Sequence, residues 1–227
     1  MHMTEGVTMI IRSACRVSMS EGEEPDYRQI IPDANLRRRI GRIVRMGLAA
    51  ASGCVGRADG VKPDAVIAST ALGCLADTEK FMKEMIEREE SMLNPSAFIY
   101  STFNTIAGQI ALAGGIREYN MTYADGGRSF RSALLDAYLC LSEGKKNILV
   151  VAFDENTPSS DKVFHRLGKQ YIHAPEAVAF LLSSEGNGPS VPEETFLCPG
   201  CDSSRDMAGN IVPAVELYRY YQDTLSD

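Results

Sequence analysis

Residues 147–153 read Asn-Ile-Leu-Val-Val-Ala-Phe, and residues 176–182 read Glu-Ala-Val-Ala-Phe-Leu-Leu. Both runs are short and almost continuously apolar, which is typical of strands that are covered on both faces of a sheet. Residues 7–18 and 64–70 are also rich in β-branched and apolar side chains, and residues 119–124 alternate enough to form a strand. The sequence therefore predicts a sheet of five strands.

Helical periodicity separates most of these strands. The clearest period runs from Phe130 to Leu141, where apolar residues recur at i, i+3, i+4, i+7, i+8 and i+11 before Gly144 ends the helix. Three more helices are expected: one amphipathic helix from Pro32 to Leu48, one capped by Asp77 that directs Phe81, Met82, Met85 and Ile86 inward, and one from Asn104 to Leu112.

The order β-α-β-α-α-β-α-β-β predicts an α/β fold. Helices that separate strands imply a mixed, mainly parallel five-stranded sheet with helices on its faces, and the two consecutive last strands imply one antiparallel edge. We expect a single domain over residues 1–227, with a core of about 7–185 followed by a loop and a C-terminal helix in 186–227.

The composition narrows the class of protein. Hydrophobic residues make up 44% of the chain and charged residues 23%, close to globular averages. No apolar run approaches the ~20 residues that span a bilayer, and the first residues lack the order of a secretion signal, so a cytoplasmic location is expected. The net charge of −7 argues against general nucleic-acid binding. Neither nucleic acid nor a membrane is an expected partner.

Cysteine and histidine give weak signals of chemistry. The six cysteines are scattered, and most of them are expected to be small buried hydrophobes. Cys198 and Cys201 have the spacing of a redox pair or of half a zinc site, but no second Cys/His pair accompanies them, so incidental thiols are favoured. His2 is expected to lie in a mobile terminus, and for His165 and His173 a surface or core-edge position is favoured. No metal and no cofactor are predicted.

Two strand ends carry polar residues. Asp154 and Glu155 follow a buried strand, where α/β proteins often bind ligands, but without a partner pattern a solvated strand end is favoured. The turn at 125–129 is more suggestive, because it leads from a strand into the amphipathic helix. The first turn of a helix presents unpaired N–H groups that lower the pKa of a thiol or hold an anion.

Several segments resemble, in order, the N-terminal half of the β-ketoacyl-acyl-carrier-protein synthases. They are Arg-Ile-Gly-Arg-Ile-Val at 39–44, Ala-Ala-Ala at 49–51, Ala-Asp-Thr-Glu-Lys-Phe at 76–81, Asn-Thr-Ile-Ala-Gly-Gln-Ile-Ala at 104–111 and Glu-Ala-Val-Ala-Phe-Leu-Leu at 176–182. The segment at 104–111 is the most specific. The resemblance spans about residues 7–185 and implies a single half of the thiolase fold.

The resemblance also implies a lost nucleophile. In that family the strand after the Gly-Gln-Ile helix ends at an elbow, Thr-Ala-Cys-Ala-Ser-Gly, whose cysteine takes the acyl chain. Placing residues 120–124 on this strand puts Gly127 at the cysteine position. Cys140 would lie about three helical turns further on. The family's two catalytic histidines belong to a second half that this chain lacks. The degenerate elbow is Asp125, Gly126, Gly127, Arg128 and Ser129, and no residue is expected to be catalytic.

Chain-length factors are relatives of this kind, and the chain is similar to them. The implied function is a non-catalytic partner of an active ketosynthase in fatty-acid, polyketide or aryl-polyene-type synthesis. The implied heterodimer interface contains Tyr119, Asn120, Met121, Thr122 and Tyr123 of an edge strand, with Asn104, Ala107 and Ile110 of the neighbouring helix near the partner's product tunnel.

Some alternatives stay open. An acyl transferase or hydrolase would use a residue other than cysteine, such as Asp125 or Ser129. A free-standing acyl-binding or scaffold homodimer would need no ketosynthase. Arg38, Arg42 and Arg45 lie on a predicted helix and are candidates for docking an acyl carrier protein by charge, although a solvated helix face is the favoured interpretation.

Overall fold

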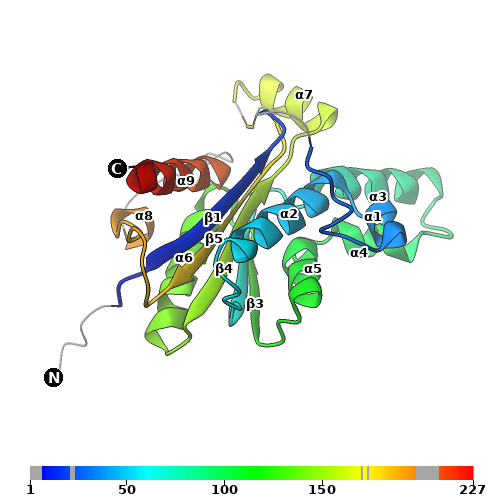
Figure 1. Ribbon diagram of the computed structural model, residues 1–227. Coiled ribbons are helices and arrows are strands. Elements are labelled where there is room, and N and C mark those ends of the chain that lie inside the picture. The colour runs from blue at the N-terminus through cyan, green and yellow to red at the C-terminus, as the bar shows by residue number, and fades with distance from the viewer. Residues whose placement is uncertain (1–6, 21–23, 170, 173, 198–209, 227) are drawn as a thin grey trace.

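The protein is an α/β structure in which helices cover both faces of one five-stranded sheet (Figure 1). The computed structural model describes residues 7–20, 24–169, 171–172, 174–197 and 210–226. The predicted fold class is confirmed. None of the described helices is both long enough and apolar enough to span a membrane.

All five predicted strands are present. They are β1 (Ile10–Ser18), β2 (Ala65–Ser69), β3 (Tyr119–Tyr123), β4 (Asn147–Asp154) and β5 (Glu176–Ser183), in the spatial order β1-β5-β4-β2-β3. β2 is parallel to β3 and β4, whereas β5 is antiparallel to both β1 and β4. The predicted antiparallel pairing of the last two strands is present, but β5 is not an edge strand, because β1 covers its free side and places that fully apolar strand inside the sheet.

The helices form two cover layers. The first contains α2 (Arg42–Gly56) and α5 (Thr105–Gly114), and the second contains α6 (Ser129–Ser142), α8 (Glu194–Leu197) and α9 (Ile211–Ser226). α1 (Ala34–Arg39), α3 (Leu75–Glu87), α4 (Pro95–Ser101) and α7 (Pro158–Arg166) complete the described helices. α3 and α4 pack on each other and project to one side (Figure 1).

Hydrophobic cores cover both faces of β4 and β5, which explains the unbroken apolar runs of these two strands. Alternate residues of β4 enter different cores: Leu149, Val151 and Phe153 join the core under α2 and α5, and Ile148, Val150 and Ala152 join the core under α6 and α9. The four described cysteines, Cys15, Cys54, Cys74 and Cys140, are buried as expected. Cys198 and Cys201, like His2 and His173, lie outside the described residues.

The helix predicted from Pro32 to Leu48 is two helices. α1 ends at Ile40, which is extended, and Gly41 then caps α2. A Cβ atom on residue 41 would lie 2.2 Å from Oδ2 of Asp77, so any larger residue here would require the Asp77 side chain to move. The apolar period continues across the break because Ile40 and Ile43 are both buried, and the pattern alone therefore does not reveal the break.

The prediction for the helix near Asp77 was wrong in two respects. α3 begins before Asp77, with Cys74 at its cap position, and none of its residues is buried. Met82 is 44% exposed and Ile86 is 73% exposed. The apolar period of α3 is covered only in part, by the short α4, where the rings of Phe81 and Phe98 lie 5.6 Å apart.

Two helices after β4 were not predicted, and a third, the C-terminal helix, begins earlier than expected. Thr157 and Ser160 form a capping box with Pro158 in the first turn, so residues 158–166 fold into α7 between β4 and β5. The segment expected to be a loop contains α8, and α9 begins at Ile211, two residues before Pro213. Proline is compatible with the first turn of a helix because its missing N–H has no partner there.

Candidate functional site

Three polar segments meet where the parallel strands end. β2 leads into residues 70–74, β3 leads into the turn at 125–129, and β4 ends at Asp154. These strands run in the same direction, so their carboxyl ends share one edge of the sheet, the position at which α/β proteins bind ligands. The backbone N–H of Thr70 donates to the carbonyl oxygen of Tyr123 at 3.0 Å, which joins the first two segments.

The turn at 125–129 is a single 3₁₀ turn that leads into α6. Gly126 has φ of 53°, a left-handed conformation that favours glycine, and Gly127 is buried. The Ser129 hydroxyl accepts from the backbone N–H of Asp125 at 2.7 Å and donates to the carbonyl oxygen of Gly126 at 2.8 Å. Arg128 binds the Asp125 carboxylate, with Nε 2.9 Å from Oδ2. The hydroxyl of Ser129 and the carboxylate of Asp125 are therefore both bonded within the turn.

Asp154 and Glu155 are buried, so the expectation of a solvated strand end was wrong. Oδ1 of Asp154 accepts from the hydroxyl of Thr70 and from the backbone N–H of Ala71, each at 2.9 Å. Oε1 of Glu155 accepts from the backbone N–H of Ala76 at 2.9 Å. These partners lie about eighty residues away in sequence, and for that reason no local pattern revealed them.

Asn210 closes this strand end from the second layer. Its Nδ2 donates to Oδ2 of Asp154 at 2.6 Å and also to the carbonyl oxygens of Phe153 and Ser69, at 3.3 and 3.4 Å. Asn210 immediately precedes α9 and is fully buried. The start of α9 is therefore fixed to the ends of both β2 and β4.

Burial makes both carboxyl groups hold their protons more tightly than usual. It raises the pKa of Asp154 to about 6, although hydrogen bonds from Asn210, Ala71 and Thr70 act in the opposite direction. Burial, together with the charge of Asp77, raises the pKa of Glu155 to about 7. The site can thus hold or release a proton near neutral pH.

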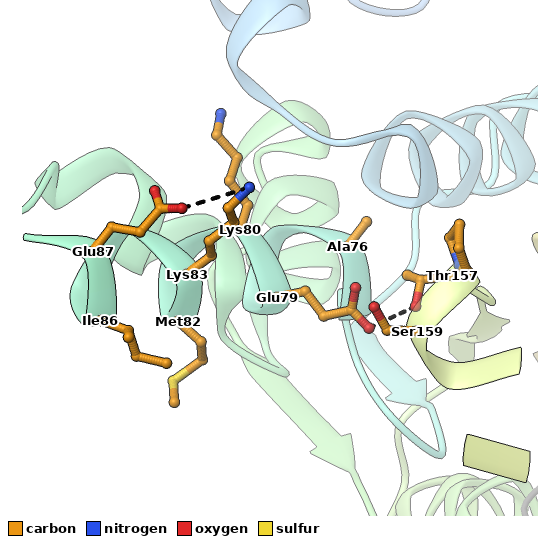
Figure 2. A pocket seen from close by; sticks show the side chains of 10 residues that line it. Ala76, Glu79, Lys80, Met82, Lys83, Ile86, Glu87, Thr157 and Ser159 are labelled. Carbon is orange, nitrogen blue, oxygen red and sulfur yellow. Dashed lines mark hydrogen bonds and ion pairs between the residues drawn. The ribbon is translucent and has the colours of Figure 1, made fainter. Parts of the chain in front are cut away.

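An open groove of about 750 Å³ lies beside this site, between α3 and α7. Figure 2 shows Met82 and Ile86 on one side of α3 and Glu79 directed toward Thr157, whose hydroxyl donates to Oε1 of Glu79 at 2.6 Å. This hydrogen bond joins α3 to the start of α7. The wall of α3 combines the two apolar side chains with charged ones, among them Lys83 and Glu87, which form an ion pair.

A family model described as the beta-ketoacyl synthase, N-terminal domain matches residues 12–207. The chain belongs to this family. No curated protein sequence matches this ketosynthase-like chain significantly.

Solved structures share the fold at low sequence identity. A ketosynthase (ApeO) in complex with its chain length factor (ApeC) from Xenorhabdus doucetiae matches with a TM-score of 0.63 and 18% identity, over 80% of this chain and 81% of that chain. The ishigamide ketosynthase/chain length factor matches with a TM-score of 0.66 and 16% identity, over 81% of this chain and 65% of that chain. A beta-ketoacyl synthase from Burkholderia phymatum STM815 matches with a TM-score of 0.62 and 12% identity, over 78% of this chain and 59% of that chain. The chain covers less than two thirds of the last two.

β3 of this ketosynthase-like chain is an edge strand that pairs with β2. Asn120 and Met121 are exposed, whereas Tyr119, Thr122 and Tyr123 are half-buried. The Tyr119 hydroxyl donates to Asp136 of α6, and Nδ2 of Asn120 donates to the carbonyl oxygen of Ala107 in α5 at 3.0 Å. The strand is therefore held by the helices on both faces while its outer edge is open.

The neighbouring helix α5 presents a different face from the one predicted. Ala107 and Ile110 are buried in the core beneath α2, so they contribute little to the surface of this chain. Asn104 is exposed, Gly108 is half-buried with open space where a Cβ would be, and Leu112 is 77% exposed. These three positions are four residues apart, so they form one outward stripe, which we call the outer stripe of α5.

The predicted carrier-docking arginines do not form one free surface. Arg38 lies on α1 and is exposed, but Nε of Arg42 binds Oε1 of Glu24 at 2.7 Å, and Arg45 lies over the ring of Tyr27. Arg42 and Arg45 thus hold the segment that precedes α1. His165 is exposed on α7.

We expect stability to fall as pH rises from about 4.5 to 7. In this window the folded protein keeps a proton on Glu155 that the unfolded chain has lost, so ionisation favours unfolding. Glu155→Gln keeps the oxygen that accepts from Ala76 and cannot ionise. The variant should be more stable than the native protein at pH 8 by roughly 1–3 kcal/mol and should flatten the pH dependence, with Asp154 causing the remaining slope.

Urea unfolding at pH values from 4.5 to 8 measures this effect. Glu87→Gln is the control, because Glu87 is exposed on α3. An unchanged pH dependence in Glu155→Gln would show that Glu155 is ionised in the folded protein.

Proposed function

We propose that this chain is a non-catalytic, chain-length-factor-like partner of an active β-ketoacyl synthase in fatty-acid, polyketide or aryl-polyene-type synthesis. One observation carries the proposal: an open edge strand, β3, leads into a helix-start turn that contains glycine at 127 and no cysteine. Family membership and the fold shared with ketosynthase/chain length factor complexes support the same assignment.

The lack of a nucleophile rests on the geometry of the turn. By the family resemblance Gly127 stands at the position of the acylated cysteine, and glycine has no side chain to acylate. Cys140 does not replace it. It is buried on α6 beyond the first turns, and burial together with the Asp136 carboxylate raises the pKa of its thiol. The Ser129 hydroxyl is bound to backbone groups on both sides, which disfavours the alternative of a serine enzyme.

The need for a partner rests on the edge of the sheet. An edge strand exposes unpaired N–H and C=O groups to other chains. Exposed apolar side chains flank this edge: Met121 on β3 itself, Leu112 on α5, and Leu135 and Leu139 on α6. α5 and α6 both contact β3, so these side chains lie around one strand. A partner that adds a strand to β3 would cover all of them.

The role in product length would belong to the outer stripe of α5. Asn104, Gly108 and Leu112 face outward beside β3, whereas Ala107 and Ile110 face the core of this chain. A side chain at Gly108 would point into open space and therefore toward the partner. In the second candidate function, a scaffold or acyl-binding homodimer, another copy of this chain would cover the same edge.

The Met121→Glu variant tests the partner. A charge at this position would have to be buried by any chain that pairs with β3, so co-purification with a co-expressed active ketosynthase should fall at least tenfold. Met92→Glu is the control, because Met92 is 91% exposed at the far end of the α3–α4 pair. Equal co-purification of both variants would place the interface elsewhere. A stable native self-dimer that ignores the ketosynthase would support the homodimer instead.

Incubation with acyl-carrier thioesters should leave the isolated protein unmodified, because the turn at 125–129 offers no thiol and its one hydroxyl is occupied. Intact-mass spectrometry reads this directly, with an active ketosynthase as the positive control. A stable acyl adduct on a residue of the turn would favour the acyl transferase or hydrolase alternative.

Enlarging Gly108 to Phe should shorten the product of the ketosynthase pair, because the new ring would project from the outer stripe into the partner's tunnel. Mass spectrometry of the released chains gives the length distribution. Leu167→Phe, at the exposed C-cap position that follows α7, should leave that distribution unchanged. If Gly108→Phe still binds the ketosynthase and the product length is native, the stripe does not limit the chain.

A further inference from the structure

A second, smaller groove lies between α2 and α5, at the opposite end of the sheet from the strand-end carboxylates. Its volume is about 480 Å³, within the range of small-molecule sites. Its floor is Leu149 of β4, and Pro63, just before β2, lies at its rim. The remaining described lining residues are Ile30, Leu48, Ala51, Ser52, Val55, Gly56, Gly60, Lys62, Ile110, Ala113, Gly114 and Ile116.

The groove exists because α2 and α5 are in close contact at one point and have small residues facing each other beyond it. α2 and α5 touch at Gly47, where a Cβ atom would lie 2.7 Å from Cγ2 of Ile106. Further along both helices the facing positions include Ala51 and Gly56 of α2, and Ala113 and Gly114 of α5. Their side chains are too short to fill the space between the helices. The floor of the sheet is therefore accessible from outside.

The chemistry of the lining selects the ligand. The walls are aliphatic, and none of the described lining residues is aromatic, so a flat ring finds no stacking partner. Ser52 and Lys62 supply the polar side chains. Two polar side chains are too few to bind a sugar or a nucleotide, because the many polar groups of such a ligand would lose their hydrogen bonds to water on burial. An unbranched hydrocarbon chain matches the walls.

Lys62 selects the head group of that ligand. It is the one charged residue among those described at the groove, it is exposed, and it forms no ion pair with another described residue. A carboxylate at the rim would pair with this ammonium group while staying in contact with water. We infer that the groove binds a free aliphatic carboxylate, with its chain between α2 and α5 and its head at Lys62. This site is separate from the β3 edge and does not depend on the partner proposal.

Displacement of a fluorescent fatty-acid probe from the full-length protein tests the site. Octanoate, decanoate and dodecanoate should compete with increasing affinity, by up to about fourfold per methylene, because each buried methylene contributes about 0.8 kcal/mol. Dodecanoate should also bind several-fold more tightly than dodecanol. No displacement, or affinity independent of chain length, would overturn the proposal.

Two variants with matched controls locate the binding. Ala113→Phe fills the groove from an exposed position and should weaken dodecanoate binding at least tenfold, whereas Leu112→Phe, one residue away on the outer stripe, should not. Lys62→Glu should remove the preference for dodecanoate over dodecanol, and Lys162→Glu on α7 should keep it. Native affinity in Ala113→Phe would place the ligand elsewhere, and an unchanged carboxylate preference in Lys62→Glu would exclude the assigned head position. Circular dichroism confirms that each variant is folded.

Discussion

The buried carboxylate of Asp154 organises the end of the sheet at which the loop after β2, the end of β4 and the start of α9 meet. One of its oxygens satisfies the hydroxyl of Thr70 and the N–H of Ala71, and the other receives the amide of Asn210. A buried polar group without partners costs about 1–3 kcal/mol, so each of these segments stays in place because the others do. The loop after β2, the end of β4 and the start of α9 therefore form one unit.

The same unit also fixes the position of β3 and of the turn that follows it. The loop after β2 is bonded to the end of β3 through the Thr70 to Tyr123 contact, and β3 continues into the turn that contains Gly127. The position of the open edge is thus set by buried groups behind it. A partner meeting this edge would find it already ordered, which lowers the entropy that binding must overcome.

Periodicity and residue type predicted most helices and strands. Contacts between residues distant in sequence determine the details that were missed. β2, β4, β5, α5 and α6 follow from local patterns because each buries an apolar face, whereas β3 was predicted from alternation although none of its residues is fully buried. The close approach of Asp77 to Gly41 was not predictable, since it is a contact between residues distant in sequence. The burial of Asp154 and Glu155 was missed for the same reason. Conversely, Thr157 followed by Pro158 is a readable helix-start pattern that was overlooked.

The residues of α5 face three different environments, because their positions in the sequence place them on different sides of the helix. Ala107 and Ile110 face the core, Gly108 faces outward beside β3, and Ala113 faces the groove next to α2. An α-helix has 3.6 residues per turn, so neighbouring residues point about 100° apart. Residues 107, 108 and 113 therefore face three different directions. Because Asn120 of β3 donates to the carbonyl oxygen of Ala107, the edge strand is bonded directly to this helix. Any shift of α5 that widens or narrows the groove must therefore either move the edge of the sheet or break that hydrogen bond.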